Sequence, residues 1–217
     1  MKHFSPVLQD LVNAFKGLPG IGVKSAQRIV FNLIQHNQEK ALFLSETIKN
    51  ALENITECSN CRMYTDSDLC EICSDPNRNS AMLCVIESPA DMIAIENSMS
   101  FNGRYFVLMG KLSPLDGIGP DQLKLDMLDS IIKEGSIKEI ILANSPTIEG
   151  EATASYILGL IEDTDIEATR IAYGVPMGGE LEYVDSSTLT QALINRSLVS
   201  LSLIHISEPT RPLYMSY

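Results

Sequence analysis

The sequence predicts an α+β protein built from several parts: an N-terminal helical region, a four-cysteine metal element and a C-terminal α/β domain with a mostly parallel sheet. Three observations support this fold class. Apolar residues recur at helical spacing before residue 56, two Cys-x-x-Cys pairs follow, and strand and helix patterns then alternate. The 217 residues suffice for one large domain or two smaller ones. No apolar run approaches the roughly 20 residues that a membrane span needs.

The N-terminal region is predicted to contain three helices. The first covers residues 7–15, where apolar residues share one face, and Gly17 is a suitable C-cap. The short segment Leu18-Pro19-Gly20-Ile21-Gly22 separates it from an amphipathic second helix over residues 23–34. A third amphipathic helix is expected from about residue 39 to residue 55.

The segment between the first two helices has the features of a phosphate-binding hairpin. Gly20 and Gly22 allow close approach of a nucleic-acid backbone, and Ile21 between them can pack inward. The free N–H groups at the start of the next helix favour an anion. Lys24 and Arg28 lie four residues apart on one face and add positive charge. The pattern favours DNA binding without sequence preference over a plain helical turn with a solvated basic face.

The four-cysteine element has the spacing Cys58-x2-Cys61 and Cys70-x2-Cys73. Two such pairs complete a tetrahedral sulfur shell, so we predict one structural Zn²⁺ per chain. The intervening segment has few apolar residues, and the metal must therefore supply its folding free energy. No signal peptide precedes it, so we expect a cytoplasmic chain in which disulfides are rare. A redox role is disfavoured, because a redox Cys-x-x-Cys motif uses one pair in a βαβ context, whereas this polar segment contains two pairs. The fifth cysteine, Cys84, fits a buried strand as a core residue.

The remainder of the chain alternates between strand and helix patterns, which predicts a parallel sheet covered on both faces. The expected strands are residues 82–86, 105–109, 140–143 and 168–172, and the expected helices are residues 90–97, 121–133 and 152–161. A glycine-rich loop over residues 174–180 precedes a last helix at 187–195. The final stretch, residues 198–217, lacks a cap or a clear period. It is either an edge strand or sequence that is not native, and it carries little weight in the prediction.

The charge is distributed unevenly along the chain. The formal net charge is -12, but residues 1–57 carry six basic and five acidic side chains. Residues 81–180 carry six basic and sixteen acidic side chains. Because an acidic surface repels nucleic acid, a phosphate-binding face is expected in the N-terminal third.

Several stretches together resemble the bacterial recombination mediator family RecR, in the order found in that family. They read LPGIGVKSAQRIVFNL, the four-cysteine element, VIESPADMIAIE, YFVLMGKLSPLDGIGP, EGEATASYI and YGVPMGGELEYVD, and cover about residues 5 to 196. The resemblance implies a helix-hairpin-helix DNA-binding region at 1–56, a four-cysteine zinc finger at 57–79 and a Toprim domain at 80–175. A C-terminal loop and helix at 176–197 and the atypical tail follow.

The resemblance also implies a function and partners. Members of this family act in recombinational repair of gapped DNA, as clamp or loading factors with the proteins RecO and RecF. They assemble into ring-like tetramers that can surround DNA, at the nucleoid of the bacterial cytoplasm. None of this assembly follows from composition or spacing.

The Toprim resemblance raises an enzymatic alternative. In enzymes with this fold, a glutamate after the first strand and a later Asp-x-Asp pair hold magnesium for phosphoryl transfer. Glu87 matches the first position, but Asn144 and Ser145 follow the later strand where the acidic pair belongs. We therefore predict a non-enzymatic protein without catalytic residues, in which Glu87, Glu149 and Glu151 contribute to a partner-binding surface. The alternatives are a magnesium-dependent nuclease or primase-like enzyme, and a protein-interaction scaffold that does not contact DNA.

Overall fold

The computed structural model describes residues 4–172, 174–176 and 178–196. The expected atypical tail at 198–217 lies outside the described residues. The chain divides into two compact units, Met1–Thr169 and Arg170–Tyr217.

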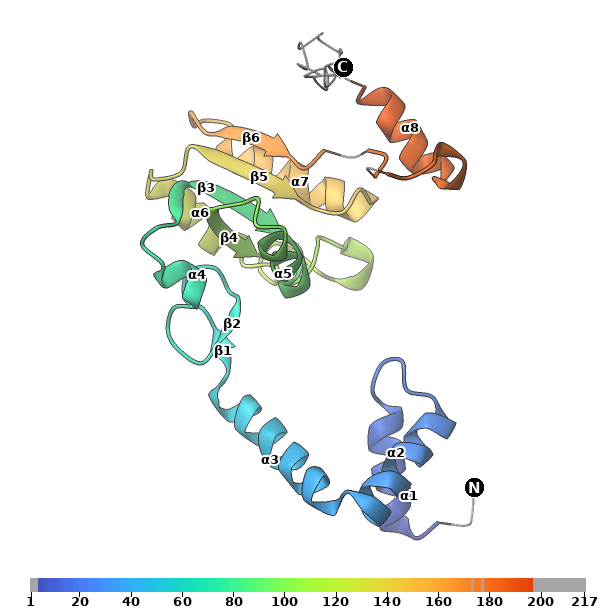
Figure 1. The fold of residues 1–217 in the computed structure, drawn as a ribbon. Helices are drawn as coiled ribbons and strands as arrows, with labels where there is room; N and C mark the ends of the chain where they lie inside the picture. The colour runs from blue at the N-terminus through green and yellow to red at the C-terminus, as the bar shows by residue number, and fades with distance from the viewer. Residues whose placement is uncertain (1–3, 173, 177, 197–217) are drawn as a thin grey trace, which may run out of the picture. The chain divides into compact units, whose positions relative to one another are not determined.

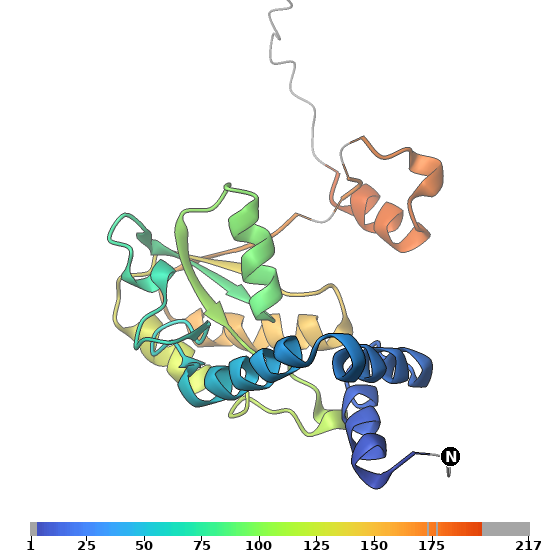
Figure 2. The ribbon, with the colours of Figure 1, turned by 60° about the horizontal axis from the view of Figure 1, so that its bottom comes forward.

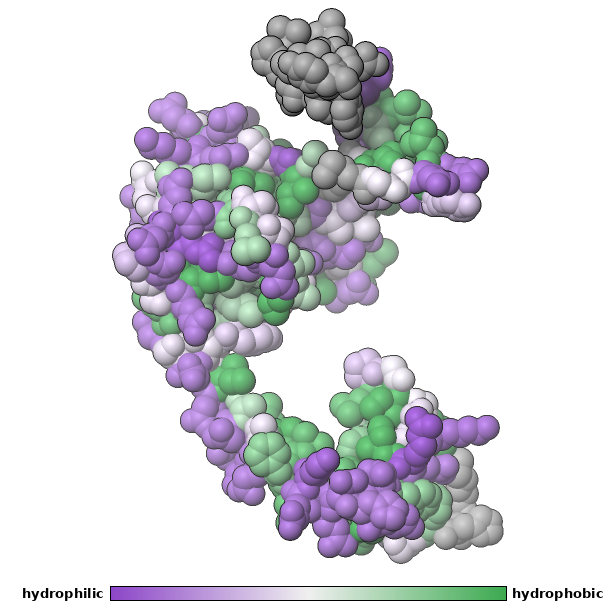
Figure 3. All heavy atoms as spheres, in the orientation of Figure 1, coloured by the Kyte–Doolittle hydropathy of each residue, from purple (hydrophilic) through white to green (hydrophobic). Residues whose placement is uncertain are grey.

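Three helices open the first unit, as the apolar spacing predicts: α1 (Pro6–Lys16), α2 (Val23–His36) and α3 (Gln38–Asn54). The hydroxyl of Ser5 caps α1 by accepting a hydrogen bond from the Leu8 N–H at 3.4 Å. A small core forms where α1 meets α2, around the buried residues Val12, Ala26 and Val30. No residue of α3 is buried among those that the structure describes, and apolar side chains along it are visible in green in Figure 3.

A compact cysteine-rich element follows α3. Two short antiparallel strands, β1 (Thr56–Glu57) and β2 (Tyr64–Thr65), enclose the first cysteine pair. The second pair lies at the short helix α4 (Glu71–Ser74), with Cys70 at its N-cap and Cys73 within it. All four cysteines therefore come from loops and helix ends that converge on one point.

A four-stranded sheet forms the centre of the α/β domain. Its strands are β3 (Asn79–Ile86), β4 (Gly103–Val107), β5 (Glu139–Ala143) and β6 (Glu167–Arg170), in the order β4-β3-β5-β6. The central strand β3 pairs in parallel with both β4 and β5. This arrangement confirms the predicted parallel sheet.

Helices cover both faces of the sheet, as Figure 1 and Figure 2 show. The helix α5 (Pro89–Asn97) lies on one face, while α6 (Leu125–Lys133) and α7 (Ile148–Ile161) lie on the other. Side chains along β3 alternate between two cores, because successive residues of a strand point to opposite faces. Leu83 and Val85 enter the larger core, and Cys84 and Ile86 enter the smaller one beneath α5. The core position predicted for Cys84 is thus confirmed.

Some helix boundaries differ from the sequence prediction. The expected helix at 121–133 begins only at Leu125, because Lys124 adopts a left-handed conformation with φ of 52°. The expected helix at 152–161 begins earlier, at Ile148, where the Thr147 hydroxyl accepts a hydrogen bond from the Gly150 N–H at 3.1 Å. Gly150 is required there, since a Cβ atom would lie 2.0 Å from the carbonyl oxygen of Ser145.

The second unit contains a short 3-10 turn (Leu181–Tyr183) and the helix α8 (Ser186–Ile194). Asp185 caps α8 by accepting hydrogen bonds from two backbone N–H groups, including that of Thr188 at 2.9 Å. This helix matches the one predicted over residues 187–195. Of the helices in the described part of the chain, none is both long and apolar enough to cross a membrane.

Candidate nucleic-acid interface and metal centre

The hairpin between α1 and α2 presents an uncapped helix start. Gly22 occupies the N-cap of α2, and no side chain in the described residues accepts a cap hydrogen bond there. The first helical bond joins the Ala26 N–H to the Gly22 carbonyl oxygen at 2.9 Å. The preceding N–H groups, those of Val23, Lys24 and Ser25, therefore have no acceptor within the helix. They form the kind of donor set that binds a phosphate oxygen.

The two hairpin glycines differ in what the fold demands of them. Gly20 has φ of +79°, which disfavours any other residue. Gly22 has an ordinary φ of -80°, and a Cβ atom there would meet nothing within 4 Å. Ile21 between them packs against the small helical core, as predicted. The open space at Gly22 is consistent with close approach of something outside the chain.

Lys24 and Arg28 lie on the exposed face of α2 just beyond the hairpin. Neither takes part in any of the ion pairs formed by the described residues. Their charges are therefore available to an external anion. All four predicted hairpin residues are exposed, and Lys24 and Arg28 share one face of α2 near its start.

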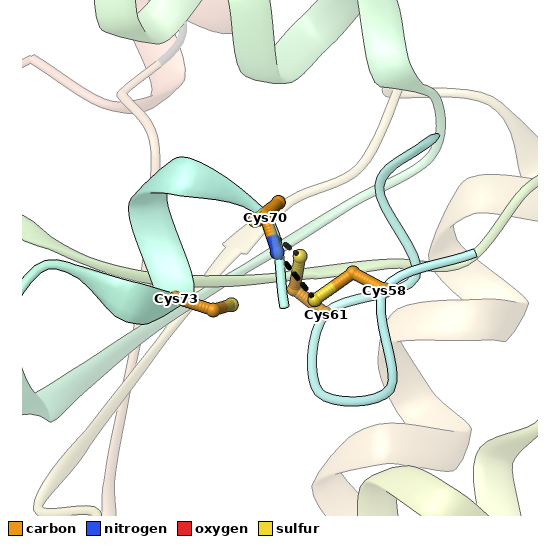
Figure 4. A group of neighbouring side chains, drawn as sticks. All are labelled: Cys58, Cys61, Cys70 and Cys73. Atoms are coloured by element: carbon orange, nitrogen blue, oxygen red, sulfur yellow. Dashed lines mark hydrogen bonds between the residues drawn. The ribbon is translucent and has the colours of Figure 1, made fainter. Parts of the chain in front are cut away.

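The four cysteine sulfurs lie within 4.8 Å of one another, and all four residues are buried. Figure 4 shows Cys73 extending from α4 toward the other three. The Cys61 and Cys70 sulfurs are 3.5 Å apart. A tetrahedral Zn²⁺ with Zn–S bonds of about 2.3 Å would separate its sulfurs by about 3.8 Å. The donor set therefore fits one zinc ion without rearrangement of the backbone.

Backbone N–H groups donate hydrogen bonds to two of the four sulfurs. The Cys70 N–H donates to the Cys58 sulfur at 3.3 Å, and the Met63 N–H donates to the Cys61 sulfur at 3.4 Å. Burial acts to raise the pKa of Cys58, but backbone hydrogen bonds at Cys61, Cys70 and Asn60 outweigh it and lower that pKa to about 7. The hydrogen bond with Cys73 and burial raise the pKa of Cys61, and burial raises that of Cys70 to about 11. The pKa of Cys84, which has only burial acting on it, rises to about 12. Cys84 thus remains an inert core thiol.

A buried arginine connects the zinc finger to the sheet. Arg62 is 3% exposed, and its Nη1 donates to the carbonyl oxygens of Leu108 at 3.0 Å and Leu123 at 2.8 Å. Its Nε donates to Glu57 at 3.1 Å. The pKa of Glu57 is lowered, because hydrogen bonds from Arg62 and Lys124 outweigh its partial burial. This network fixes the cysteine-rich element on the core of the α/β domain.

The predicted partner-binding glutamates lie at the carboxyl edge of the sheet, with different surroundings. Glu87 follows β3 and accepts hydrogen bonds from the Ser145 N–H at 2.7 Å and the Ser145 hydroxyl at 2.8 Å. Glu149 lies in the first turn of α7, where Lys111 is 3.7 Å from its carboxylate. Glu151 is an exposed residue of the same turn.

These surroundings do not fit the magnesium site of Toprim enzymes. The Glu87 carboxylate is already held by Ser145, which stands where an acidic ligand would be needed. The Lys111 ammonium, 3.2 Å from the Thr147 hydroxyl, places a positive charge beside Glu149. In the described residues, the four cysteines form the one cluster of three or more ligand side chains.

The geometry thus defines a class of protein: a Toprim-fold protein with a hairpin suited to phosphate and a four-cysteine zinc finger. The sequence matches the family models for the RecR helix-hairpin-helix over residues 8–52 and for the RecR zinc finger domain with four cysteines over 55–75. It also matches the model of the Toprim domain over 81–172 and that of the RecR C-terminal region over 174–197.

A relative from Alcanivorax borkumensis named "Recombination protein RecR" is 49% identical over 196 residues. The match covers 90% of this chain and 98% of the relative. The chain therefore belongs to the RecR family of recombination proteins, which places it in DNA repair and recombination and supports DNA binding by its helix-hairpin-helix module. The zinc prediction is confirmed by the zinc-finger match and by the cysteine geometry.

Three residues of these networks were missed by sequence reasoning. Arg62, Glu57 and Lys111 carry the contacts described above, but each is an ordinary charged residue in a polar stretch of sequence. For Arg62 one signal was present: it directly follows Cys61, and the tight turn there holds it at φ of 69°. The turn that carries the first cysteine pair therefore sets the direction of the Arg62 side chain, and the cysteine spacing had already located this turn.

Proposed function

We propose that this protein binds DNA through the α1–α2 hairpin and acts in recombinational repair of gapped DNA. In this proposal it is a clamp or loading factor that works with RecO and RecF at the bacterial nucleoid, in the cytoplasm. The observation that supports it most directly is the uncapped start of α2, where free N–H groups, Lys24 and Arg28 share one exposed surface. Such a site contacts phosphates and has no side chain positioned to recognise base edges, so its binding does not depend on DNA sequence.

We further propose that the protein is not an enzyme. The support is chemical: Asn144 and Ser145 replace the acidic pair, and Lys111 neutralises Glu149. A cluster with one carboxylate hydrogen-bonded to Ser145 and another paired with lysine lacks the converging charge that magnesium-dependent phosphoryl transfer requires.

Self-assembly into a ring-like tetramer is the third part of the proposal. An apolar groove of about 520 Å³ runs along α1, α2 and α3, lined by Leu11, Phe15, Leu33, Ile34, Leu42 and Ile48. Large exposed apolar surfaces mark interfaces more often than free surface. A second copy of the chain is the occupant that the family supports.

The acidic edge of the Toprim domain is proposed as the surface for a basic partner protein. Glu149 and Glu151 are placed at the start of α7, and Glu87 holds the neighbouring loop through Ser145. The sixteen acidic residues between 81 and 180 would repel DNA but attract a basic protein. The same surface therefore suits RecO better than nucleic acid.

The DNA-binding proposal is tested with the double variant Lys24→Ala, Arg28→Ala on gapped and intact duplexes. Removing two phosphate contacts should weaken binding similarly for all sequences and reduce the slope of log affinity against log salt by about two. The matched control is Lys40→Ala, Lys49→Ala on α3, which removes equal charge away from the hairpin. Unchanged affinity and slope in the hairpin variant would show that DNA binds elsewhere. DNA cleavage or primer synthesis that depends on magnesium would overturn the non-enzymatic assignment.

A further inference from the structure

A cleft of about 650 Å³ lies between the zinc finger and α5. Its lining includes the apolar residues Met63, Ile72 and Met92, together with Tyr64 and Ile93 near solvent. Tyr64 is 56% exposed and Ile93 is 52% exposed. The cleft thus combines an apolar floor, in which Met92 is buried and Met63 and Ile72 are partly buried, with two large apolar side chains that water still reaches.

The cleft is held in shape from both sides. Met63 and Ile72 pack against the four-cysteine cluster and also against the core beneath α5. The Val107 N–H of β4 donates to the Cys61 carbonyl oxygen at 2.9 Å, which ties the zinc finger to the edge of the sheet. A preformed cleft binds a partner without the entropic cost of ordering its own walls.

The charge of the cleft is strongly unbalanced. Four carboxylates line it, those of Asp66, Glu71, Asp75 and Glu96, against the single guanidinium of Arg78. That guanidinium is already paired with Glu96, whose Oε1 also accepts the Tyr105 hydroxyl at 2.5 Å. None of the other three carboxylates forms an ion pair with a described residue.

The cleft is separate from the acidic edge that contains Glu87. Arg78 directly precedes β3, and Glu87 directly follows it. Eight residues of β-strand span about 26 Å. Arg78 and Glu87 therefore lie at opposite ends of the same strand, and none of Glu87, Glu149 and Glu151 lines the cleft.

We propose that this cleft is a second docking site, which binds a short basic and apolar segment of a partner protein. One or two apolar side chains of that segment insert against Met63, Ile72 and Met92. Its lysine or arginine side chains face Asp66, Glu71 and Asp75. The volume suits a few side chains, as in ligand-sized clefts of roughly 300–1,000 Å³.

Charge and polarity together select this occupant. Nucleic acid is excluded because four carboxylates against one guanidinium would face its phosphates. An acidic or neutral segment would leave those charges unpaired, whereas a purely basic one would leave the apolar floor unused. Only a segment with both characters satisfies the whole lining.

The test uses two labelled synthetic peptides and fluorescence anisotropy with the full chain. One peptide alternates pairs of lysine and leucine, and the other carries serine in place of leucine. The first should bind, with affinity that falls as salt rises from about 50 to about 300 mM. The serine peptide should bind at least about tenfold more weakly, because it cannot use the apolar floor.

Two variants localise the binding. Glu71→Lys and Ile93→Gln should each weaken the lysine–leucine peptide about tenfold, since one reverses a rim charge and the other removes an exposed apolar contact. Glu134→Lys at the C-cap of α6 and Leu158→Gln on α7 are matched controls on the opposite face of the sheet and should bind as the unmodified chain does. Retained zinc and unchanged thermal unfolding show that the variants are folded.

The outcomes are decisive in both directions. Weakened binding in the two cleft variants alone supports the site. Equal binding of both peptides reduces the cleft to a non-specific acidic surface and overturns the proposal. Equal loss in the cleft and control variants, or none in either, places the peptide elsewhere. Because neither DNA nor the acidic edge is involved, these results are independent of the proposed function.

Discussion

At the scale of single residues, the two hairpin glycines separate folding from function. Gly20 adopts a positive φ of +79°, so its identity serves the turn. Gly22 has an ordinary conformation and open space around it, so nothing within the described part of the chain requires a glycine. A polar N-cap residue would stabilise α2 more than glycine does. The absence of such a residue leaves the N–H groups of α2 free for a ligand.

The substitution Gly22→Ser tests this separation. Serine is a favourable N-cap, and its hydroxyl should accept an N–H of α2 and preserve or raise stability by a few tenths of a kcal/mol. DNA affinity should nevertheless fall severalfold, because the hydroxyl competes with phosphate and the Cβ narrows the approach. Denaturant unfolding and DNA titration measure the two effects. Asn37→Ser, at the N-cap of α3, is the control and should leave DNA affinity unchanged; a parallel loss of both properties would contradict the separation.

Arg62 is a second residue whose effect can be measured. Arg62→Met keeps an unbranched stem but leaves Glu57 and two buried carbonyl oxygens without their guanidinium partner. We expect a loss of about 3 kcal/mol in the free energy of unfolding. The comparison is Lys133→Met, which breaks an exposed pair with Asp129 and should cost less than about 0.5 kcal/mol. Similar denaturation midpoints for the two variants would show that Arg62 does not fasten the zinc finger.

At the scale of elements, the zinc finger and the edge strand β4 share one hydrogen-bond system. The Val107 N–H donates to the Cys61 carbonyl oxygen at 2.9 Å, whereas the neighbouring Leu108 N–H donates to Ile86 within the sheet region at 2.9 Å. The metal orders the knuckle that carries the first acceptor. Loss of zinc should therefore be detectable in the sheet at one identifiable amide, that of Val107.

Hydrogen exchange before and after chelation checks this connection. The purified chain should contain one zinc ion, and its removal should speed exchange of the Val107 amide far more than that of Leu108. Cys70→Ser should reproduce the change, because it removes a ligand from the sulfur shell. Cys84→Ser is the control, since that thiol lies in the core away from the metal and its variant should retain zinc. A freshly purified chain with well under one zinc would refute the site.

The elements also show what the sequence could and could not reveal. Helices α2 and α3 and the strands β3 and β5 follow from apolar periodicity, and the metal site follows from cysteine spacing. The start of α6 could not be predicted, because nothing in the sequence indicates that Lys124 adopts a left-handed backbone conformation. The hydrogen bond from Ser145 to Glu87 was also unforeseen. It joins residues 58 positions apart, and such contacts depend on strand order, which local patterns do not encode.

At the scale of the whole molecule, acidic side chains are concentrated in one part of the chain and the hairpin cations lie in another. The N-terminal third is close to neutral and carries the cations of the hairpin, while residues 81–180 hold most of the net charge. A uniformly acidic protein would be repelled by DNA along its entire surface. Concentrating the acid in the Toprim domain would let the same chain bind a polyanion and, as proposed above, a basic protein at separate places.

The acidic edge supplies the test of this division. In the variant Glu149→Ala, Glu151→Ala, affinity for RecO should fall about tenfold at low salt, because two attractive charges are lost from a rim where Lys111 then remains positive. The difference between variant and unmodified chain should shrink as salt rises through physiological strength. DNA binding by the hairpin should not weaken, since the changes remove only repulsive charge. The control Glu46→Ala, Glu53→Ala removes equal charge from exposed positions of α3. Titration with and without magnesium completes the test: unchanged RecO affinity, together with magnesium-dependent cleavage that the variant loses, would replace the docking surface with a catalytic one.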